Sequence, residues 1–406
     1  MLSVFFALFL LAGCKPVKVE TENRTDAAVE ESAVIAQAVN RFAFDLYAGY
    51  AGEAGANIFF SPYSIYAAMA VAYEGAGGKT AEEMRKVFRF PESKDSMRRG
   101  YASLYGDINR QGKKYALNTA NALWTQKDFK FADEYTAVAE RYYGGKAENL
   151  DFVNAADEAL KRINGWVEEN TGGRIKNLIP SGMLDRLTRL VITNAVYFKG
   201  EWVRQFNARD TREEVFKVSE DKSEAVPMMR RTDEESLFNY GENSLLQILE
   251  MPYSGGEISM LILLPKNGDM KSLEENLSPE KFNEWKSLMQ NQRVNIFMPK
   301  FRFERKYFMA EDLSGMGMPS AFSPQADFSL MTGEKDLFIS DVIHQAFVEV
   351  NEEGTEAAAA TAVVMKLTAV MPEQPIPVFR ADRPFIFVIQ QAGGNILFIG
   401  RVSNPA

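Results

Sequence analysis

Apolar positions along the chain follow two different periods. Four apolar residues near the start are spaced for one face of a helix: Ile35, Val39, Phe42 and Leu46. Ser32 precedes them as a candidate N-cap. By contrast, residues 191–198 form an apolar run of strand type with two polar residues inside it. Such a run is typical of a strand buried on both faces in the middle of a sheet. The pattern therefore predicts helices together with a buried sheet.

Further strand patterns are spread over the rest of the chain. They lie at residues 117–124, 250–253, 258–266, 295–301, 382–389 and 396–402. No stretch between them has the composition of an interdomain linker. We therefore expect a single folded domain, which covers residues 32–406.

A second helix signal begins at Ser61, a candidate cap that is followed by Pro62 in the first helical turn. Small residues follow, which permit close packing under another element. Glycines at 75, 77 and 78 end this pattern. Thr80 and Glu83 then have the spacing of a capping box, which predicts the start of the next helix.

The stretch 352–369 gives conflicting signals. Its alanine run, residues 357–360, favours a helix by propensity. At the period of a strand, however, the odd positions are all small or apolar and uncharged: Thr355, Ala357, Ala359, Thr361, Val363 and Met365. Within this stretch, the two charged residues that follow Gly354 are Glu356 and Lys366, and both occupy even positions. This parity suits a strand with one face on a core and the other toward water. The strand has to end before Pro372, since proline is not tolerated in a central strand.

Composition limits the classes of function. The chain has 406 residues, with 46 basic and 55 acidic side chains and a net charge of −9. This balance argues against a nucleic acid as partner. One local basic cluster is either a solvated helix face or a polyanion-binding patch. It consists of Arg85, Lys86, Arg89, Arg98 and Arg99.

Candidate catalytic chemistry is scarce. The chain has one cysteine, Cys14, and one histidine, His344. These counts exclude an intrachain disulfide and a structural zinc site of Cys and His ligands. A Ser-His-Asp or Cys-His enzyme would have to use His344, and no nucleophile elbow, P-loop or zinc-protease motif is present. Carboxylate chemistry is the enzyme class that remains, and we expect no enzyme and no metal.

The pattern at the N-terminus predicts a targeting signal. Residues 2–11 are apolar, too few to span a bilayer but enough for the core of a secretory signal. The following Leu11-Ala12-Gly13-Cys14 resembles the end of a bacterial or archaeal lipoprotein signal, which implies a lipidated Cys14 and a membrane anchor. The predicted signal covers residues 1–14 and lacks a basic residue before the apolar run. The alternative is therefore a secreted protein in which Cys14 has no role. Residues 15–31 predict a flexible tether, and we expect an exported protein at the cell surface or in the periplasm.

Several motifs together resemble the serpin family. They are Asn57-Ile58-Phe59-Phe60-Ser61-Pro62, Asn194-Ala195-Val196-Tyr197-Phe198-Lys199-Gly200-Glu201-Trp202, the hinge at 352–361, Asp382-Arg383-Pro384-Phe385, and the Gly400-Arg401-Val402 ending. They occur in the family's order over roughly residues 32–406. The resemblance implies an α+β fold of about nine helices around three β-sheets. It also implies an exposed reactive-centre loop, residues 352–378, that can insert into the central sheet.

The resemblance implies a suicide inhibitor of a serine endopeptidase, with a cysteine endopeptidase as the alternative target, and no cofactor. The target protease is then a covalent partner, and we expect a monomer. The hinge is Glu352, Glu353, Gly354, Thr355, Glu356, Ala357, Ala358, Ala359, Ala360 and Thr361. Counting from Gly354 places the reactive bond at Thr368-Ala369, with Leu367 or Lys366 as alternatives. A non-inhibitory surface-binding or chaperone protein on the same scaffold is the second hypothesis.

The same resemblance identifies a sheet-opening region. Asn194 in a buried strand needs hydrogen-bond partners, because an unpaired buried amide costs about 1–3 kcal/mol. The family pattern implies Ser61 and His344 as these partners, with Trp202 nearby. His344 is then structural rather than catalytic.

Overall fold

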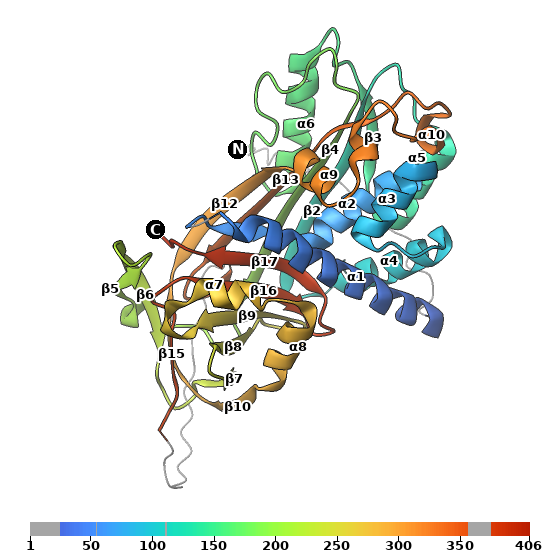
Figure 1. The fold of residues 1–406 in the computed structure, drawn as a ribbon. Helices are drawn as coiled ribbons and strands as arrows, with labels where there is room; N and C mark the ends of the chain where they lie inside the picture. The colour runs from blue at the N-terminus through green and yellow to red at the C-terminus, as the bar shows by residue number, and fades with distance from the viewer. Residues whose placement is uncertain (1–24, 54, 110–111, 356–374) are drawn as a thin grey trace, which may run out of the picture.

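The computed structural model describes residues 25–53, 55–109, 112–355 and 375–406 (Figure 1). Three β-sheets and ten α-helices lie within these residues. The α+β fold predicted from the sequence, with about nine helices around three sheets, is confirmed.

The six-stranded sheet is the central sheet of the fold. Its order is β12 (Phe301–Phe308), β13 (Ile339–Val350), β14 (Gly354–Thr355), β4 (Leu190–Glu201), β2 (Tyr115–Gln126) and β3 (Lys146–Leu150). The buried strand predicted at 191–198 is β4, and all eight of these residues are buried. Its continuous apolar pattern follows from its position, because side chains on both of its faces are covered.

Two further sheets complete the β-structure. The seven-stranded sheet has the order β1 (Ile58–Phe60), β17 (Ile396–Val402), β16 (Phe385–Gln391), β9 (Ile258–Pro265), β8 (Leu246–Pro252), β7 (Leu237–Glu242) and β10 (Gln290–Arg293). The four-stranded sheet has the order β15 (Val378–Arg380), β11 (Asn295–Pro299), β6 (Ser223–Arg231) and β5 (Arg212–Lys217).

The helices surround these sheets (Figure 1). They are α1 (Asp26–Ala51), α2 (Pro62–Glu74), α3 (Gly78–Phe88), α4 (Lys94–Asn109), α5 (Asp133–Tyr143), α6 (Ala156–Asn170), α7 (Met270–Glu275), α8 (Pro279–Ser287), α9 (Ala310–Gly315) and α10 (Ser329–Thr332). Within the described ranges, none of them is long and apolar enough to cross a membrane.

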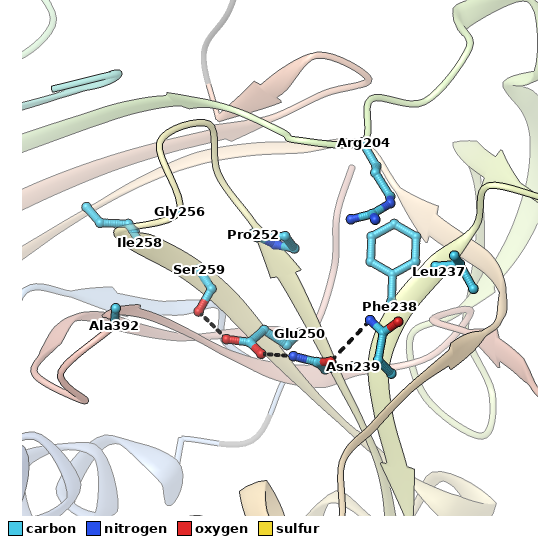
Figure 2. Close-up of a pocket in the computed structure, with 11 residues that line it drawn as sticks. Arg204, Leu237, Phe238, Asn239, Glu250, Pro252, Gly256, Ile258, Ser259 and Ala392 are labelled. Atoms are coloured by element: carbon cyan, nitrogen blue, oxygen red, sulfur yellow. Dashed lines mark hydrogen bonds between the residues drawn. The ribbon is translucent and has the colours of Figure 1, made fainter. Parts of the chain in front are cut away.

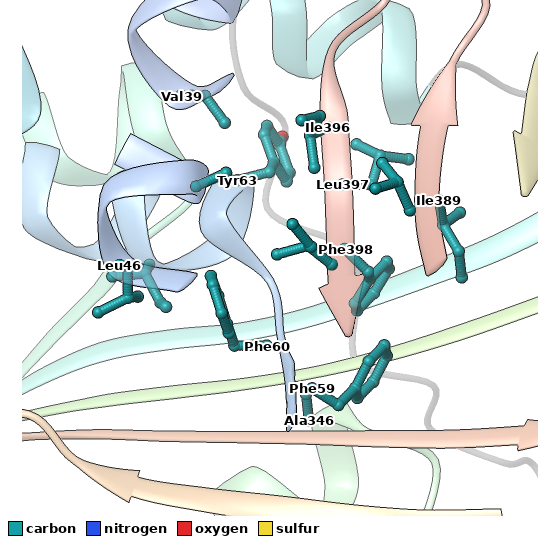
Figure 3. Close-up of a cluster of buried hydrophobic side chains, with 14 of the residues drawn as sticks. Val39, Leu46, Phe59, Phe60, Tyr63, Ala346, Ile389, Ile396, Leu397 and Phe398 are labelled. Atoms are coloured by element: carbon teal, nitrogen blue, oxygen red, sulfur yellow. The ribbon is translucent and has the colours of Figure 1, made fainter. Parts of the chain in front are cut away.

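The main hydrophobic core lies between the central sheet and the seven-stranded sheet. Phe59 of β1 stacks on Phe398 of β17 with ring centroids 5.2 Å apart, and Ala346 of β13 lies beneath them (Figure 3). Helix α2 borders this core, and every one of its residues is buried. Ser61 caps α2 as predicted, because its hydroxyl accepts a hydrogen bond from the backbone N–H of Ser64.

A second core covers the other face of the central sheet. It packs α6 and the segment that follows it against β2, β4 and β13, through residues that include Ile163, Val167, Val191 and Ile343. Helix α6 therefore lies over the pair β4 and β13 (Figure 1).

Two predictions about helix starts are wrong. Helix α1 begins at Asp26 with Thr25 as its N-cap, so Ser32 is not a cap and residues 26–31 are helical rather than part of a tether. The early turns of α1 pack on α4, where the Glu31 carboxylate accepts two hydrogen bonds from Arg99. This tertiary contact is absent from the local pattern.

The capping box is also wrong, since Gly77 takes the N-cap position of α3 without a side-chain hydrogen bond. Both predicted members of the box have tertiary partners instead. The Thr80 hydroxyl accepts from the backbone N–H of Asp327. The Glu83 carboxylate accepts from the backbone and hydroxyl of Ser320.

Candidate functional site

The central sheet contains an incomplete strand between β13 and β4. These two strands pair directly and in parallel, from Ile339 opposite Leu190 to Phe347 opposite Tyr197. At one end, β14 lies between them and is antiparallel to both, with Thr355 opposite Gly200 and Val350. Gly354 and Thr355, the third and fourth residues of the predicted hinge, therefore already form a short strand within the sheet.

Thr355 is fixed in this position by buried contacts. It is 1% exposed, and its hydroxyl lies 2.6 Å from the Tyr253 hydroxyl. The Tyr253 ring stacks on Trp202 at a centroid distance of 4.3 Å. The indole N–H of Trp202 donates to the Asn351 carbonyl at 3.1 Å. Trp202, predicted for the sheet-opening region, thus contacts the start of the hinge.

Gly354 is required by a close backbone approach. A Cβ at this position would lie 2.1 Å from the backbone oxygen of Gly200. A side chain here would therefore force β14 out of the sheet.

Glu352 is held by charge and hydrogen bonds. Its carboxylate accepts from Lys300 Nζ at 2.9 Å and from the Thr211 hydroxyl at 2.8 Å. Partial burial raises the pKa of Glu352, but the Lys300 and Thr211 contacts outweigh it and leave the pKa below its usual value. The carbonyls of Glu352 and Glu353 also accept backbone hydrogen bonds, from Phe206 and Trp202 respectively. The hinge is thus tied to the body of the protein up to Thr355.

A buried polar cluster joins β4 to β13 in the middle of their parallel pair. The Asn194 oxygen lies 2.5 Å from His344 Nδ1, and His344 Nε2 accepts from the backbone N–H of Ser61 at 3.1 Å. Because Nε2 accepts, the ring proton is on Nδ1 and is donated to Asn194. The Asn194 amide N–H groups point to the Ser64 carbonyl and to the Asn121 side-chain oxygen.

The two partners predicted for Asn194 lie in different positions relative to it. Among the hydrogen bonds of the described residues, none joins Ser61 to Asn194 directly. Ser61 reaches Asn194 through the His344 ring and also through Ser64, whose backbone N–H donates to the Ser61 hydroxyl and whose own hydroxyl accepts from the Asn194 amide. The direct partners are His344, Ser64 and Asn121. Ser64 lies one helical turn after Ser61 and Asn121 faces Asn194 across β2. Ser64 and Asn121 were not predicted as partners of Asn194. Each is a polar residue in an otherwise apolar buried segment, which is the feature of the sequence that could have identified it.

The only histidine of the chain is neutral because it is buried. Burial lowers the pKa of His344 to about 3, below the value of about 6.5 for an exposed imidazole. The unfolded chain therefore binds a proton between these two values and the folded chain does not. The contribution of His344 to stability is complete above about pH 6.5 and decreases as the pH falls toward 3.

We expect the free energy of unfolding to fall by about 2 kcal/mol between pH 8 and pH 5 through His344 alone. Urea titrations at several pH values across this range measure the free energy of unfolding. A His344→Gln variant is the control, because it lacks the contribution of the imidazole to the pH dependence. In the folded protein the single imidazole Hε1 resonance should not titrate between pH 8 and pH 5. A resonance that shifts near pH 6.5 would contradict the prediction.

The basic cluster on α3 and α4 is compensated by acidic side chains. Arg98 binds the buried Glu74 carboxylate at 2.8 Å, and Arg99 binds Glu31 at 2.6 Å. The other three members also have carboxylate partners: Arg85 with Glu92, Lys86 with Glu82, and Arg89 with Asp45. This pairing favours a solvated, ion-paired face over a polyanion-binding patch.

Several predicted site residues lie outside the described residues. They are Cys14, Glu356, Ala357, Ala358, Ala359, Ala360, Thr361, Lys366, Leu367, Thr368 and Ala369. Among the residues that are described, no group of three or more Cys, His, Asp or Glu side chains could hold a metal ion.

The fold and the hinge together define a class of protein: one with a central sheet in which a short third strand, β14, lies between two parallel strands at one end of their pair. The family model "Serpin (serine protease inhibitor)" matches residues 37–405. The chain belongs to the serpin family.

Similar proteins come from distant organisms. An uncharacterized serpin-like protein of Thermococcus kodakarensis is 46% identical over 91% of this chain and 86% of its own length. The bovine leukocyte elastase inhibitor is 40% identical over 91% of this chain and 99% of its own length. The crystal structure of Serpin48 from the insect Tenebrio molitor superposes with a TM-score of 0.81 at 33% identity, and the match covers 91% of this chain and 98% of that one.

Proposed function

We propose that this protein is a suicide inhibitor of a serine endopeptidase, with a cysteine endopeptidase as the alternative target class. The protease attacks the carbonyl carbon of Thr368, the amine of Ala369 leaves, and an acyl-enzyme forms. The freed hinge then inserts between β13 and β4 before water can hydrolyse the ester. Leu367 and Lys366 remain alternative positions for the attacked carbonyl.

The observation that carries this proposal is the position of β14. It is antiparallel to both neighbours and lies where their direct pairing ends. Extension of β14 would replace one parallel ladder by two antiparallel ladders. This exchange increases the number of backbone hydrogen bonds, and antiparallel pairs are slightly more stable per residue than parallel ones. If β14 continued along β4 in the register of Thr355 opposite Gly200, position 365 would lie opposite Leu190, the first residue of β4. The inserted strand would then end just before all three candidate bonds, so the register is compatible with each of them.

The side-chain parity supports insertion. Thr355 points to Tyr253 in the main core, so the odd positions after it would point the same way. These positions are small or apolar and uncharged, and a buried unpaired charge would cost several kcal/mol. In this register Thr361 would lie between Asn194 and His344.

The even positions would meet a different environment from the one expected from the sequence. We expected this face to remain toward water, but α6 covers its middle through the second core. Ala362 and Val364 would lie beneath α6, whereas Glu356 would lie opposite Lys199 and Glu349, which are half-exposed. Only the ends of the inserted strand would therefore remain solvated on this face.

Incubation with elastase-, chymotrypsin-, subtilisin- and trypsin-like proteases tests the proposal. We expect a covalent complex on a denaturing gel with at least one of them. Mass spectrometry of the released C-terminal fragment would then identify the reactive bond. Cleavage without a complex and without a rise in thermal stability would favour the non-inhibitory hypothesis.

We also propose that the protein is exported as a monomer and anchored in the membrane through lipidated Cys14. The apolar segment 2–11 and the Leu11-Ala12-Gly13-Cys14 ending support this proposal. Two or more acyl chains on Cys14 would give stable anchoring. Detergent phase partition of the natively produced protein, compared with a Cys14→Ala variant, distinguishes an anchored protein from a secreted one.

A further inference from the structure

A small groove opens on the seven-stranded sheet, beside the segment that follows Trp202. It has a volume of about 130 Å³ and lies between β7, the turn that joins β8 to β9, and the residues after Trp202 (Figure 2). Its wall is apolar where Leu237, Phe238, Pro252 and Ile258 line it. Leu237 is 39% exposed, so its side chain is accessible to a ligand.

Arg204 provides an available positive charge at the groove. Its guanidinium lies 5.7 Å from the centroid of the Phe238 ring, a cation–π distance. Within the described part of the chain, Arg204 has no carboxylate partner. Figure 2 shows its side chain directed toward Phe238, at the border of the groove.

The acidic residue of the groove is already occupied. The Glu250 carboxylate accepts from the Asn239 side chain at 2.8 Å and from the Ser259 hydroxyl at 2.7 Å. Asn239 is held in turn by Asn291. The polar groups at the base of the groove are thus paired with one another. The N–H donors of the Arg204 guanidinium, in contrast, are available to a ligand.

We propose that this groove binds a small carboxylate with a body the size of one ring. The carboxylate would pair with Arg204, which can donate two parallel hydrogen bonds to it. The apolar body would cover Leu237, Pro252 and Ile258. The volume of about 130 Å³ is slightly below the roughly 150 Å³ of an enclosed apolar cavity that holds benzene. The groove is open to solvent, so it can take one ring with the carboxylate at the rim beside Arg204.

The groove adjoins the segment that contacts the hinge. The backbone N–H of Val203 donates to the Pro252 carbonyl at 3.0 Å, and Trp202 contacts Asn351 and Glu353. A ligand that bridges Arg204 and β8 would therefore hold this segment against the sheet. The binding itself does not depend on whether the protein inhibits a protease.

Benzoate and its uncharged isostere benzamide test the proposal by saturation-transfer NMR and calorimetry. We expect benzoate to bind the full-length protein with a dissociation constant of about 1 mM, and benzamide to bind about tenfold or more weakly. Arg204→Gln should weaken benzoate about tenfold without changing benzamide. Arg209→Gln, which removes an exposed arginine outside the groove, is the matched control and should bind benzoate as the natural protein does.

Equal binding of the two compounds, or unchanged benzoate binding by Arg204→Gln, would overturn the proposal. Absence of benzoate binding at tens of millimolar would do the same. Leu237→Asp serves as a second variant in case Arg204→Gln does not fold. It places a carboxylate of the chain itself at the exposed rim near Arg204 and is expected to suppress benzoate binding.

Discussion

A Thr355→Arg variant is expected to be cleaved in its loop by the target protease without forming the covalent complex. Thr355 is 1% exposed and contacts the Tyr253 hydroxyl. In the intact variant the arginine can avoid burial, because β14 is only two residues long and can leave the sheet. Insertion has to return position 355 to the core and bury the unpaired charge there, at a cost of several kcal/mol. If only about 3 kcal/mol of this cost is felt in the transition state for insertion, insertion slows by roughly 100-fold. Hydrolysis of the acyl-enzyme would then outcompete insertion.

The yield of complex per cleaved inhibitor measures this effect on a denaturing gel. Glu356→Arg is the matched control, because it places the same side chain one position later, where an inserted strand would point it to the face opposite to that of Thr355. We expect this control to retain most of the complex. Complex formation by Thr355→Arg at the natural yield would contradict the insertion mechanism.

The sequence predicted those parts of the fold in which local pattern and tertiary environment agree. β4 was predicted because burial on both faces produces a continuous apolar run, and α2 because Ser61 and Pro62 form its first turn. The predictions failed where a long-range contact decides the outcome. Thr80 and Glu83 have capping-box spacing, but Asp327 and Ser320 take their hydrogen bonds.

The candidate site shows the same division. His344 and Asn194 were predicted as partners and do contact each other. Asn121 was missed because its partner depends on the register of β2 against β4, which places Asn121 opposite Asn194. A strand pattern identifies which residues are buried, but does not specify which residue of the neighbouring strand lies opposite. The Arg204 groove was missed for a similar reason, since it combines residues from several separate segments.

The register of the central sheet leads to a second prediction, a Thr361→Val variant that weakens only the cleaved form. Insertion would separate His344 from Asn194 and place Thr361 between them. The Thr361 hydroxyl could accept the His344 Nδ1 proton and donate to the Asn194 oxygen. Valine has nearly the same shape but no hydroxyl. Each buried polar group left unpaired would cost about 1–3 kcal/mol.

Urea unfolding of the intact and the loop-cleaved protein measures this difference. We expect Thr361→Val to leave the intact form unchanged, because His344 and Asn194 are paired with each other there. The cleaved form should lose about 2–4 kcal/mol, whereas Thr361→Ser, which keeps the hydroxyl, should lose much less. An equal loss for serine and valine would show that methyl packing, not the hydroxyl, matters at this position. No loss in either variant would mean that the inserted strand does not continue the register of Thr355, because only that register brings position 361 to the Asn194–His344 pair.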